Sequence, residues 1–348
     1  MNVVMASYAA VALLHGGPRT QILGTARHLP AHGVQAHLFD PWANISRGTC
    51  DLIHLFAANI GTYHLAREVA ALGIPMVVSP IVFSRHPPAV VRRRLRFAGV
   101  LHRARPGLWS DYGLTAEICR WASRIIPNTA AEAELMVRGY GIPAAAVSVV
   151  PNGVDERFAG GDPELFRRKY GLDDFVLNVG HVGPARKNTL ALIQALGGID
   201  HPSVIIGRVT RDAAGEACVR EAARYRQILL LDRMENDSAM LASAYAACRV
   251  FVLPSLFETP GIAALEAALA GAQVVITPYG GTREYFEDMA TYVDPYSVAS
   301  IREGIQRELG APPSERLREH VRQKFLWSRV AKLTAGIYRD VLKESGTP

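Results

Sequence analysis

Residues 251–277 read FVLPSLFETPGIAALEAALAGAQVVIT, and this stretch changes pattern three times. A short apolar run ends at Leu253, a loop follows, and an apolar segment with helical spacing continues from Pro260 to Gly271. Proline and glycine at these places are typical of the start and the end of a helix. The stretch therefore predicts a strand, a loop, a helix and a second strand, which is the repeating unit of a parallel α/β sheet.

Short apolar runs alternate with helical spacing along the rest of the chain as well. Helical spacing covers residues 19–32, 63–72 and 129–140. Runs short enough for strands occur at 2–5, 35–39, 52–56, 75–79, 124–126 and 147–150, and then at 175–179, 203–206, 228–231, 249–253, 273–276 and 291–293. Because 348 residues exceed what one core serves well, we predict an α/β protein with two Rossmann-like doubly wound parallel sheets.

The boundary between the two predicted domains is placed near residue 170. Residues 156–174 are rich in glycine, proline and charge, a composition expected of a connection. Ligands of open parallel sheets bind outside the carboxyl ends of the strands, so two sheets that face one another would form a cleft lined by strand-to-helix loops. An unused cleft between two covered sheets is the alternative.

Composition excludes several classes of protein. Apolar residues make up 49% and charged residues 20%, as in ordinary globular proteins. The four cysteines form no CxxC pair, which favours neither disulfides nor zinc and suits the cytoplasm. Residues 3–14 are apolar enough for a signal peptide but lack a basic start, and no apolar run reaches the roughly 20 residues of a membrane span. We expect a cytoplasmic protein.

The net charge of +6 does not identify a partner, and no metal is expected. A basic balance suits nucleic acid, anionic lipid and phosphorylated small molecules alike. No DxD motif occurs, and no group of His, Cys or carboxylate residues has the spacing of metal ligands. We therefore predict a site that works with arginine, lysine and helix amides instead of a metal ion.

The loop before the predicted helix carries chemistry of its own. Free amides at a helix start, with the helix dipole behind them, suit a phosphate, so residues 259–262 (Thr259, Pro260, Gly261, Ile262) are candidate ligand contacts. Glu258 and Glu266 are eight residues apart, about two helical turns, which would place both on one side of the element. The alternative is that Glu258 is a helix-start charge and Glu266 part of a solvated face.

The pair in ETPGIAALE resembles the E-x7-E motif of retaining glycosyltransferases of the GT-B fold, in particular the large family 4 (GT4). The resemblance implies that Glu258 orients the donor sugar and that Glu266 holds the ribose of the nucleotide, since both roles need acceptors of hydroxyl hydrogens. It also implies a nucleotide-diphosphate sugar as donor, of the GDP or UDP type, no further cofactor, and transfer with retention without a protein nucleophile.

A second stretch, NVGHVGPARKN at 178–188, strengthens the resemblance. Relatives commonly hold the donor diphosphate with an arginine just after the first glycine and a lysine some six residues later. Lys187 matches the lysine and Arg186 precedes it, whereas His181 stands where the arginine is expected. Cations beside a diphosphate neutralise it as its bond to the sugar breaks. A plain surface position is the alternative for Lys187.

Two further stretches resemble the same family. VVPNGVD at 149–155 is similar to its interdomain signature, and FLWSRVAKLTAGIYRDVL at 325–342 to its last helix, which packs back on the first domain. The predicted domains are thus an acceptor-binding domain of residues 1–170, completed by the helix 325–348, and a donor-binding domain of residues 171–324.

The first domain matches the family less closely. In HGGPRTQ at 15–21, Gly16 and Gly17 allow close approach to a phosphate or sugar, with a tight turn as the alternative. Many relatives place a histidine soon after the fourth strand, but VVSPIVFSRHP at 77–87 has Ser79 and Pro80 there, and no motif transfers the role to His86. The nucleotide base is expected near Arg233 and Met234, mostly on backbone groups.

Residues 85–105 carry seven arginines and no acid. Such a run attracts anionic lipid, which suits an enzyme that glycosylates a lipid-linked acceptor at the inner face of the cytoplasmic membrane. A solvated basic loop or a site for an anionic acceptor glycan is the alternative. Phe97 is the run's one stacking aromatic, so a nucleic-acid partner is not expected.

These features together predict a hexosyltransferase for bacterial surface polysaccharide or lipopolysaccharide synthesis, acting on a glycan or lipid-linked acceptor. Two rival functions stay open. A nucleotide-sugar epimerase of the same architecture would bind the same donor but would need acid and base groups at the sugar. A non-catalytic nucleotide-sugar or carbohydrate-binding protein would fit the departures at His181 and Ser79.

Overall fold

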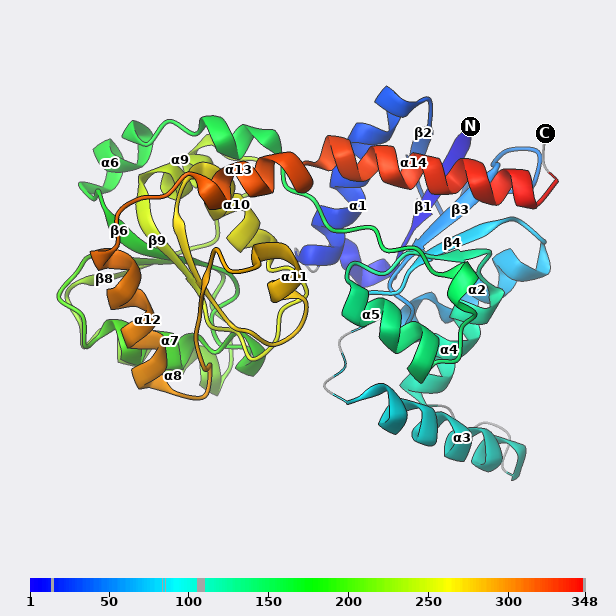
Figure 1. Ribbon diagram of the computed structural model, residues 1–348, viewed down its shortest axis with the longest axis horizontal. Coiled ribbons are helices and arrows are strands. Elements are labelled where there is room, and N and C mark those ends of the chain that lie inside the picture. The colour runs from blue at the N-terminus through cyan, green and yellow to red at the C-terminus, as the bar shows by residue number, and fades with distance from the viewer. Residues whose placement is uncertain (14–15, 83, 85, 105–109, 347–348) are drawn as a thin grey trace. The chain divides into compact units, whose positions relative to one another are not determined.

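A computed structural model describes residues 1–13, 16–82, 84, 86–104 and 110–346, and the chain divides into two compact units (Figure 1). The first unit comprises Met1–Gly153 and Trp327–Pro348, and the second comprises Val154–Leu326. The junction thus lies at residues 153 and 154, earlier than the predicted boundary near residue 170. The sequence prediction also assigned residues 325–348 to the first unit.

The second unit is built on six parallel strands. The strands are β6 (Phe175–Val179), β7 (Ser203–Ile206), β8 (Ile228–Leu231), β9 (Cys248–Leu253), β10 (Gln273–Ile276) and β11 (Thr291–Tyr292). They lie in the order β8-β7-β6-β9-β10-β11, so the strand order reverses between β6 and β9. This is the Rossmann order, in which ligands bind at the reversal point.

The helices of the second unit bury side chains on both faces of this sheet. They are η5 (Glu156–Gly160), α6 (Glu164–Tyr170), η6 (Ala185–Lys187), α7 (Thr189–Leu196), α8 (Ala213–Ala222), α9 (Ala239–Ala247), α10 (Ile262–Ala270), α11 (Thr282–Phe286), α12 (Val298–Gly310) and α13 (Arg316–Lys324). Neighbouring residues of one strand join different cores: Leu177 packs with Phe251, whereas Val176 packs with Val250. Alternation between two apolar faces explains the continuous apolar runs of the sequence.

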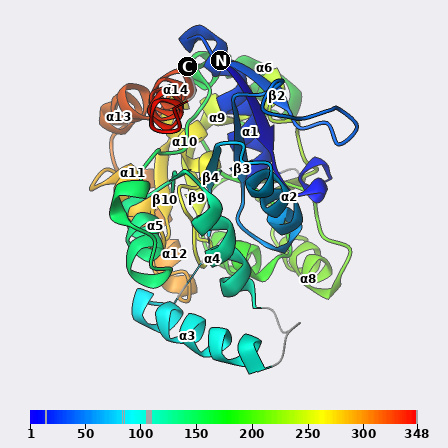
Figure 2. The same ribbon diagram turned by 90° about the vertical axis from the view of Figure 1, so that its right-hand side faces the viewer.

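The first unit holds five parallel strands in the order β2-β1-β3-β4-β5. The strands are β1 (Asn2–Ala6), β2 (Gln35–Leu38), β3 (Leu52–Phe56), β4 (Met76–Ser79) and β5 (Arg124–Ile125). The helices are η1 (Ala9–Ala12), α1 (Gly17–His28), η2 (Leu29–His32), α2 (Ile60–Ala71), α3 (Pro88–Ala104), α4 (Asp111–Trp121), α5 (Ala130–Glu134), η3 (Leu135–Gly139), η4 (Ala144–Ala146) and α14 (Trp327–Glu344). In Figures 1 and 2, α3 lies beside α4 at the rim of this unit.

The predicted fold class, two doubly wound parallel α/β sheets, is confirmed, and one predicted strand is wrong. Residues 147–150 form only an isolated bridge, between Val147 and Ile125. Val150 N still donates to Pro127 O at 3.0 Å, so the segment runs beside β5. Proline has no N–H to return a hydrogen bond, and we attribute the short ladder to Pro127.

Residues 156–174 were expected to be a connection between the domains. They belong to the second unit instead. Phe158 of η5 and Phe166 of α6 are both at most 1% exposed in the core of the second unit. The Phe166 amide donates to the Ser243 hydroxyl at 2.8 Å. The two apolar side chains therefore attach this segment to the second unit, which moves the junction to residue 153.

Trp327 anchors α14 within the first unit, and two glycines make room for it. A Cβ atom at Gly24 would lie 2.4 Å from the indole, and one at Gly153 would lie 2.5 Å from it. Gly153 belongs to the VVPNGVD stretch, which resembles the family's interdomain signature. Its lack of a side chain lets the last helix dock.

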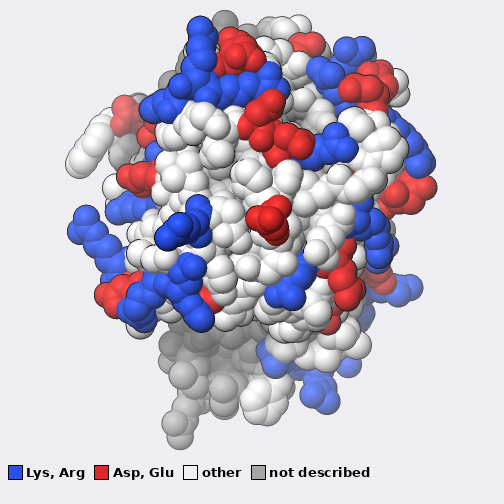
Figure 3. Space-filling view, turned by 90° about the vertical axis from the view of Figure 1, so that its left-hand side faces the viewer, with Lys and Arg blue, Asp and Glu red and all other residues white. Residues whose placement is uncertain are grey.

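Two features of the whole chain concern its surroundings. In the part that the structure describes, every helix is too short or too polar to cross a bilayer. On the face drawn in Figure 3, lysine and arginine side chains are interspersed with acidic ones. The positive net charge is therefore not gathered into one patch on that face.

Candidate functional site

The carboxyl ends of β6 and β9, where the strand order of the second sheet reverses, carry three of the predicted site residues. The loop after β6 supplies Arg186 and Lys187 in η6, and the loop after β9 supplies Glu258. The Arg186 carbonyl accepts a hydrogen bond from the Leu256 amide at 2.8 Å, which fastens one loop to the other. The fold thus brings together residues that are about 70 positions apart in the sequence.

Glu258 interacts with both cations. Lys187 Nζ donates to Glu258 Oε1 at 2.6 Å, and an Arg186 guanidinium nitrogen lies 3.2 Å from the same oxygen. Arg186 also donates to the Phe257 carbonyl at 2.9 Å. Glu258 is only 6% exposed, whereas the side chains of Lys187 and Arg186 are 22% and 43% exposed. The cations therefore lie between a buried carboxylate and the surface.

The ionisation of Glu258 depends on these partners. Burial alone would raise the pKa of its carboxyl, but attraction to Lys187 and then to Arg186 outweighs burial and lowers the pKa. Glu258 is therefore a carboxylate at neutral pH and an acceptor of hydrogen bonds. A group in this state is suited to holding hydroxyl groups rather than to donating a proton.

Two residues that the sequence analysis did not single out hold these loops in place. Asn188 is the N-cap residue of α7 and has a φ of 56°, and its side-chain amide donates to the carbonyls of Pro254 at 3.0 Å and Pro295 at 2.6 Å. Gly280, with a φ of 102°, passes so close to Glu258 that a Cβ atom would lie 1.9 Å from the Glu258 carbonyl oxygen. Asn188 ends the stretch at 178–188, and Gly280 comes shortly after the stretch at 251–277. Both are residue types that form turns, which was the only sequence signal for them.

Glu266 has different partners. Asn236 donates to its Oε1 and Tyr245 to its Oε2, each at 2.8 Å. Burial raises the pKa of the Glu266 carboxyl to about 7, although the bonds from Asn236 and Tyr245 act to lower it. Asn236 in turn binds Arg157, whose guanidinium donates to the Asn236 side chain at 3.0 Å. Glu266 is thus a buried group beside the loop that follows β8.

The argument that two helical turns separate Glu258 and Glu266 is wrong. Glu258 lies before the helix, in a bridge with Gly280, and α10 begins only at Ile262 after Gly261 with a φ of 77°. Thr259 and Pro260 belong to the same loop, and Gly261 and Ile262 form the start of α10. The loop is non-helical because it has to bring Glu258 back against Tyr279, whose carbonyl accepts the Glu258 amide at 3.1 Å.

His181 lies in the loop after β6, five residues before Arg186. Its carbonyl accepts a weak hydrogen bond from the Thr189 hydroxyl at 3.5 Å, which places it against the start of α7. Its side chain is half-buried. A role for His181 toward a diphosphate stays a prediction.

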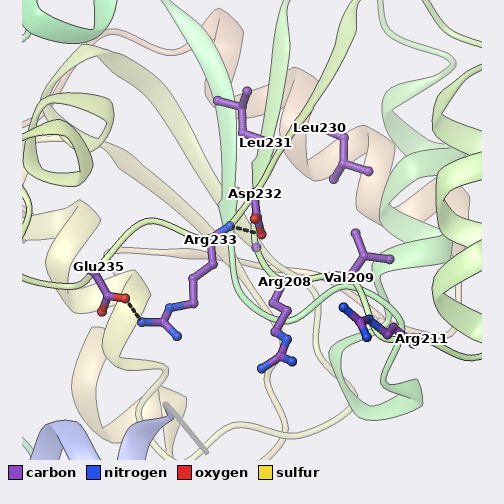
Figure 4. Close-up of a pocket in the computed structure, with 9 residues that line it drawn as sticks. Arg208, Val209, Arg211, Leu230, Leu231, Asp232, Arg233 and Glu235 are labelled. Atoms are coloured by element: carbon purple, nitrogen blue, oxygen red, sulfur yellow. Dashed lines mark hydrogen bonds and ion pairs between the residues drawn. The ribbon is translucent and has the colours of Figure 1, made fainter.

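An open pocket of about 630 Å³ lies at the carboxyl ends of β7 and β8 (Figure 4). Its walls come from residues 207–209, 211, 230–233 and 235, so Arg233 is one of them. The nucleotide base near Arg233 and Met234 stays a prediction. The Met234 side chain packs against the core of the second unit, which leaves its backbone groups as the part that could face a ligand. Arg208, Arg211 and Asp232 also line the pocket, and the sequence analysis gave them no role.

The glycine pair of the predicted site belongs to the first unit, as does Ser79, which stands where many relatives have a histidine. Gly16 precedes α1, and Gly17 is its first residue, followed by Pro18. Ser79 ends β4 and is buried, and its hydroxyl lies 3.0 Å from His54 Nε2, while His54 Nδ1 lies 2.6 Å from the Tyr338 hydroxyl. Burial lowers the pKa of His54 to about 3, so this histidine is neutral and structural. The roles of Gly16 and Gly17 stay predictions.

Most of the basic run at 85–105 forms α3. Val91 is buried against the first unit, while Arg92, Arg93 and Arg96 are exposed and Phe97 is 72% exposed. Arg85 and Arg105 lie outside the described residues. Within the described part of the chain, no group of three or more His, Cys, Asp or Glu side chains could hold a metal ion. Independence of metals stays a prediction.

Comparison with known protein families matches both halves of the chain. Residues 173–310 match the family "Glycosyl transferases group 1", and residues 42–158 match "Glycosyltransferase Family 4". Among curated proteins, a D-inositol 3-phosphate glycosyltransferase of Saccharomonospora viridis is 28% identical over 85% of this chain and 71% of its own length. One of Acidothermus cellulolyticus is 27% identical over 94% of this chain and 77% of its own.

Solved structures share the fold along the chain's length. Sucrose-phosphate synthase of Thermosynechococcus elongatus has a TM-score of 0.74 at 18% identity, covering 99% of this chain and 100% of its own. HepE of Anabaena in complex with UDP and glucose has a TM-score of 0.68 at 17% identity, covering 98% and 100%. At such identities the likeness concerns the fold.

Proposed function

The chain is a GT4-like glycosyltransferase of the GT-B fold, and from this premise we propose that it transfers a hexosyl group, with retention, from a nucleotide-diphosphate sugar to a glycan or lipid-linked acceptor. The observation that carries the proposal is the cluster of Arg186, Lys187 and Glu258 at the point where the second sheet reverses its strand order. That point is where open parallel sheets bind nucleotides.

The two cations would hold the donor diphosphate. Both are partly exposed, and both already face a single anionic oxygen of Glu258. Charge-assisted hydrogen bonds from Arg186 and Lys187 would neutralise the diphosphate as its bond to the sugar breaks, which lowers the barrier to transfer without a metal ion. The start of α10 at Ile262 would add backbone amides and the positive end of the helix dipole.

The two glutamates would bind the groups on either side of the diphosphate. Glu258, kept ionised by its cations, would accept hydrogen bonds from hydroxyls of the donor sugar. Glu266 would accept one from the ribose. It lies next to the loop of Asn236, which continues into the wall of the pocket near Arg233, so the nucleotide base would lie in that pocket.

The acceptor has two candidates. The sequence resemblance favours a growing surface polysaccharide or a lipid-linked oligosaccharide. The curated relatives are named for D-inositol 3-phosphate, which favours a phosphorylated polyol as the second candidate. Offering the enzyme both kinds of acceptor with one donor would decide between them.

A transfer assay with radiolabelled GDP and UDP sugars tests the proposal. We expect sugar to be moved to an acceptor, and the anomeric configuration of the product, read by proton NMR, to equal that of the donor. Lys187→Ala should lower turnover by about 100-fold or more, since it removes a cation that acts on the leaving group. Lys169→Ala is the matched control, because Lys169 is a lysine of α6 in the same unit that belongs to no part of the site.

The outcomes separate the rivals. Equal turnover in the Lys187 and Lys169 variants would contradict the proposed role of the cation cluster. Donor binding without transfer to any acceptor would favour the non-catalytic reading, and interconversion of the donor sugar without an acceptor would favour the epimerase.

The proposal includes a contact between α3 and anionic membranes. Arg92, Arg93 and Arg96 with the exposed Phe97 join charge and an apolar side chain on one helix, and this combination binds the surface of an anionic bilayer. Vesicles with anionic lipid should retain the protein at low salt, and the double variant Arg93→Glu/Arg96→Glu should abolish retention. Equal retention of both proteins would exclude α3 as the contact.

A further inference from the structure

The pocket after β7 and β8 is lined by two arginines that form no ion pair with another described residue. In the described part of the chain, the guanidinium groups of Arg208 and Arg211 have no hydrogen-bond or ion-pair partner, although both line the pocket. Arg233, by contrast, is paired with Glu235. The side chains of Arg208 and Arg211 are both exposed, so their guanidinium donors are open to a ligand that offers acceptor atoms.

One carboxylate lies in the same wall. Asp232 follows β8 directly and accepts a hydrogen bond from the Arg233 amide on Oδ1 at 2.7 Å. This bond uses only part of the carboxylate's capacity, because a carboxylate has about four acceptor sites. In the view of Figure 4, the Arg208 side chain is drawn between those of Arg233 and Arg211, and the dashed line joins the Asp232 carboxylate to the Arg233 amide.

A nucleotide whose diphosphate is bound by Arg186 and Lys187 could place its base in this pocket. β7 and β8 are one and two strands away from β6 in the sheet, which places their carboxyl ends about 5 to 10 Å from that of β6. This inference rests on the proposed function, because it takes Arg186 and Lys187 to hold the diphosphate.

We propose that Asp232 and Arg208 make this pocket specific for guanine, so that the donor is a GDP sugar. Guanine places two neighbouring donors, N1–H and the 2-amino group, where a carboxylate can accept both. Its O6 and N7 are the acceptor pair that an arginine fork binds in bidentate fashion. Guanine therefore uses both the carboxylate and the guanidinium.

The other common bases fit this wall less well. Adenine and cytosine present an unprotonated ring nitrogen on the same edge, which would repel the Asp232 carboxylate. Uracil and thymine present one N–H between two carbonyl oxygens, so the second carboxylate oxygen would face a carbonyl oxygen. Asp232 is exposed in the free protein, so binding a wrong base would take water from its carboxylate without supplying donors, which gives Asp232 the larger share of the discrimination.

Calorimetric titration with GDP, UDP, ADP and inosine diphosphate tests the proposal on the full chain. The wild type should bind GDP about 10- to 100-fold more tightly than UDP or ADP, since a hydrogen bond to a charged group is at stake. Inosine diphosphate lacks only the 2-amino group and should bind more weakly than GDP but more tightly than ADP. Asp232→Ala should remove the preference for GDP over inosine diphosphate.

Two controls separate this inference from the proposed function. Asp237→Asn changes an exposed acid on the same loop that is not among the residues lining the pocket, and it should leave the preference for GDP unchanged. Lys187→Ala should weaken the binding of all four nucleotides by a similar factor.

A third variant tests the guanine contact itself. Arg208→Lys keeps the charge but not the planar fork of the guanidinium, and it should weaken the binding of GDP more than that of UDP.

Three results would overturn the guanine assignment. They are equal binding of GDP and UDP by the wild type, an unchanged base preference in Asp232→Ala, and a uniform loss of all nucleotides in Arg208→Lys, which would mean that Arg208 binds phosphate. In each of these cases Lys187→Ala would still weaken binding, so the proposed function would stand. If no nucleotide binds to the wild type, both the proposed function and the guanine assignment fail.

Discussion

Glu266 should make the stability of the second unit depend on pH. Burial raises the pKa of its carboxyl from 4.5 to about 7 in the folded protein. Between these two values the folded protein keeps a proton that the unfolded chain releases, so the contribution of Glu266 to stability is full below pH 4.5 and is lost as pH rises through 7. The difference in pKa corresponds to about 3 kcal/mol of unfolding free energy.

The isosteric variant Glu266→Gln removes this titration. We expect the difference in unfolding free energy between the variant and the wild type to move in favour of the variant by about 3 kcal/mol from pH 4.5 to pH 8. Any constant loss from mismatched bonds to Asn236 or Tyr245 cancels in this comparison.

Urea unfolding followed by circular dichroism measures this effect, and fluorescence supplies an internal control. All four tryptophans of the chain belong to the segments of the first unit, so tryptophan fluorescence should report the same midpoint for both proteins at each pH. A difference between variant and wild type that stays constant from pH 4.5 to pH 8 would refute the reasoning about the buried carboxyl.

Three further substitutions test the packing of the site and of the last helix. Gly280→Ala should lower the unfolding free energy of the second unit by about 1–3 kcal/mol, measured by circular dichroism, because the new Cβ atom would meet the Glu258 carbonyl at a positive φ; an unchanged midpoint would contradict this. Gly153→Ala should destabilise the first unit by about 1–3 kcal/mol in tryptophan fluorescence, because it collides with Trp327; no change would mean that the helix repacks freely. Lys187→Met should raise the pKa of Glu258 and cost up to about 3 kcal/mol at pH 7, and adding Glu258→Gln should restore most of the loss; no recovery in the double variant would argue against the ion pair.

Much of the fold could be predicted because parallel strands are buried on both faces. All six strands of the second unit lie where their apolar runs indicated, since a continuous run such as FVLNV at β6 has no other stable place. The strand predicted at 147–150 was wrong because the ladder depends on Pro127, more than 20 residues away. The domain boundary was misplaced because Phe158 and Phe166 gave a weaker signal than the glycines beside them.

Residues of the candidate site could be predicted only where they stand together in a short, recognisable stretch of sequence. Arg186, Lys187 and Glu258 stand in recognisable motifs, and the structure joins them. The bonds from Asn236 and Tyr245 to Glu266 cross 30 and 21 positions and leave no local pattern. Arg208 was overlooked because the pocket that it lines forms only when β7 and β8 pair and bring their following loops together.

The central claim is that the second unit holds a donor diphosphate on Arg186 and Lys187. A crystal structure of the protein with a nucleotide-diphosphate sugar or its nucleoside diphosphate bound would test it most directly. We predict diphosphate oxygens within hydrogen-bond distance of Lys187 Nζ and the Arg186 guanidinium, which now share Glu258 Oε1. A diphosphate bound elsewhere, with the Lys187–Glu258 contact of 2.6 Å unchanged, would contradict the claim.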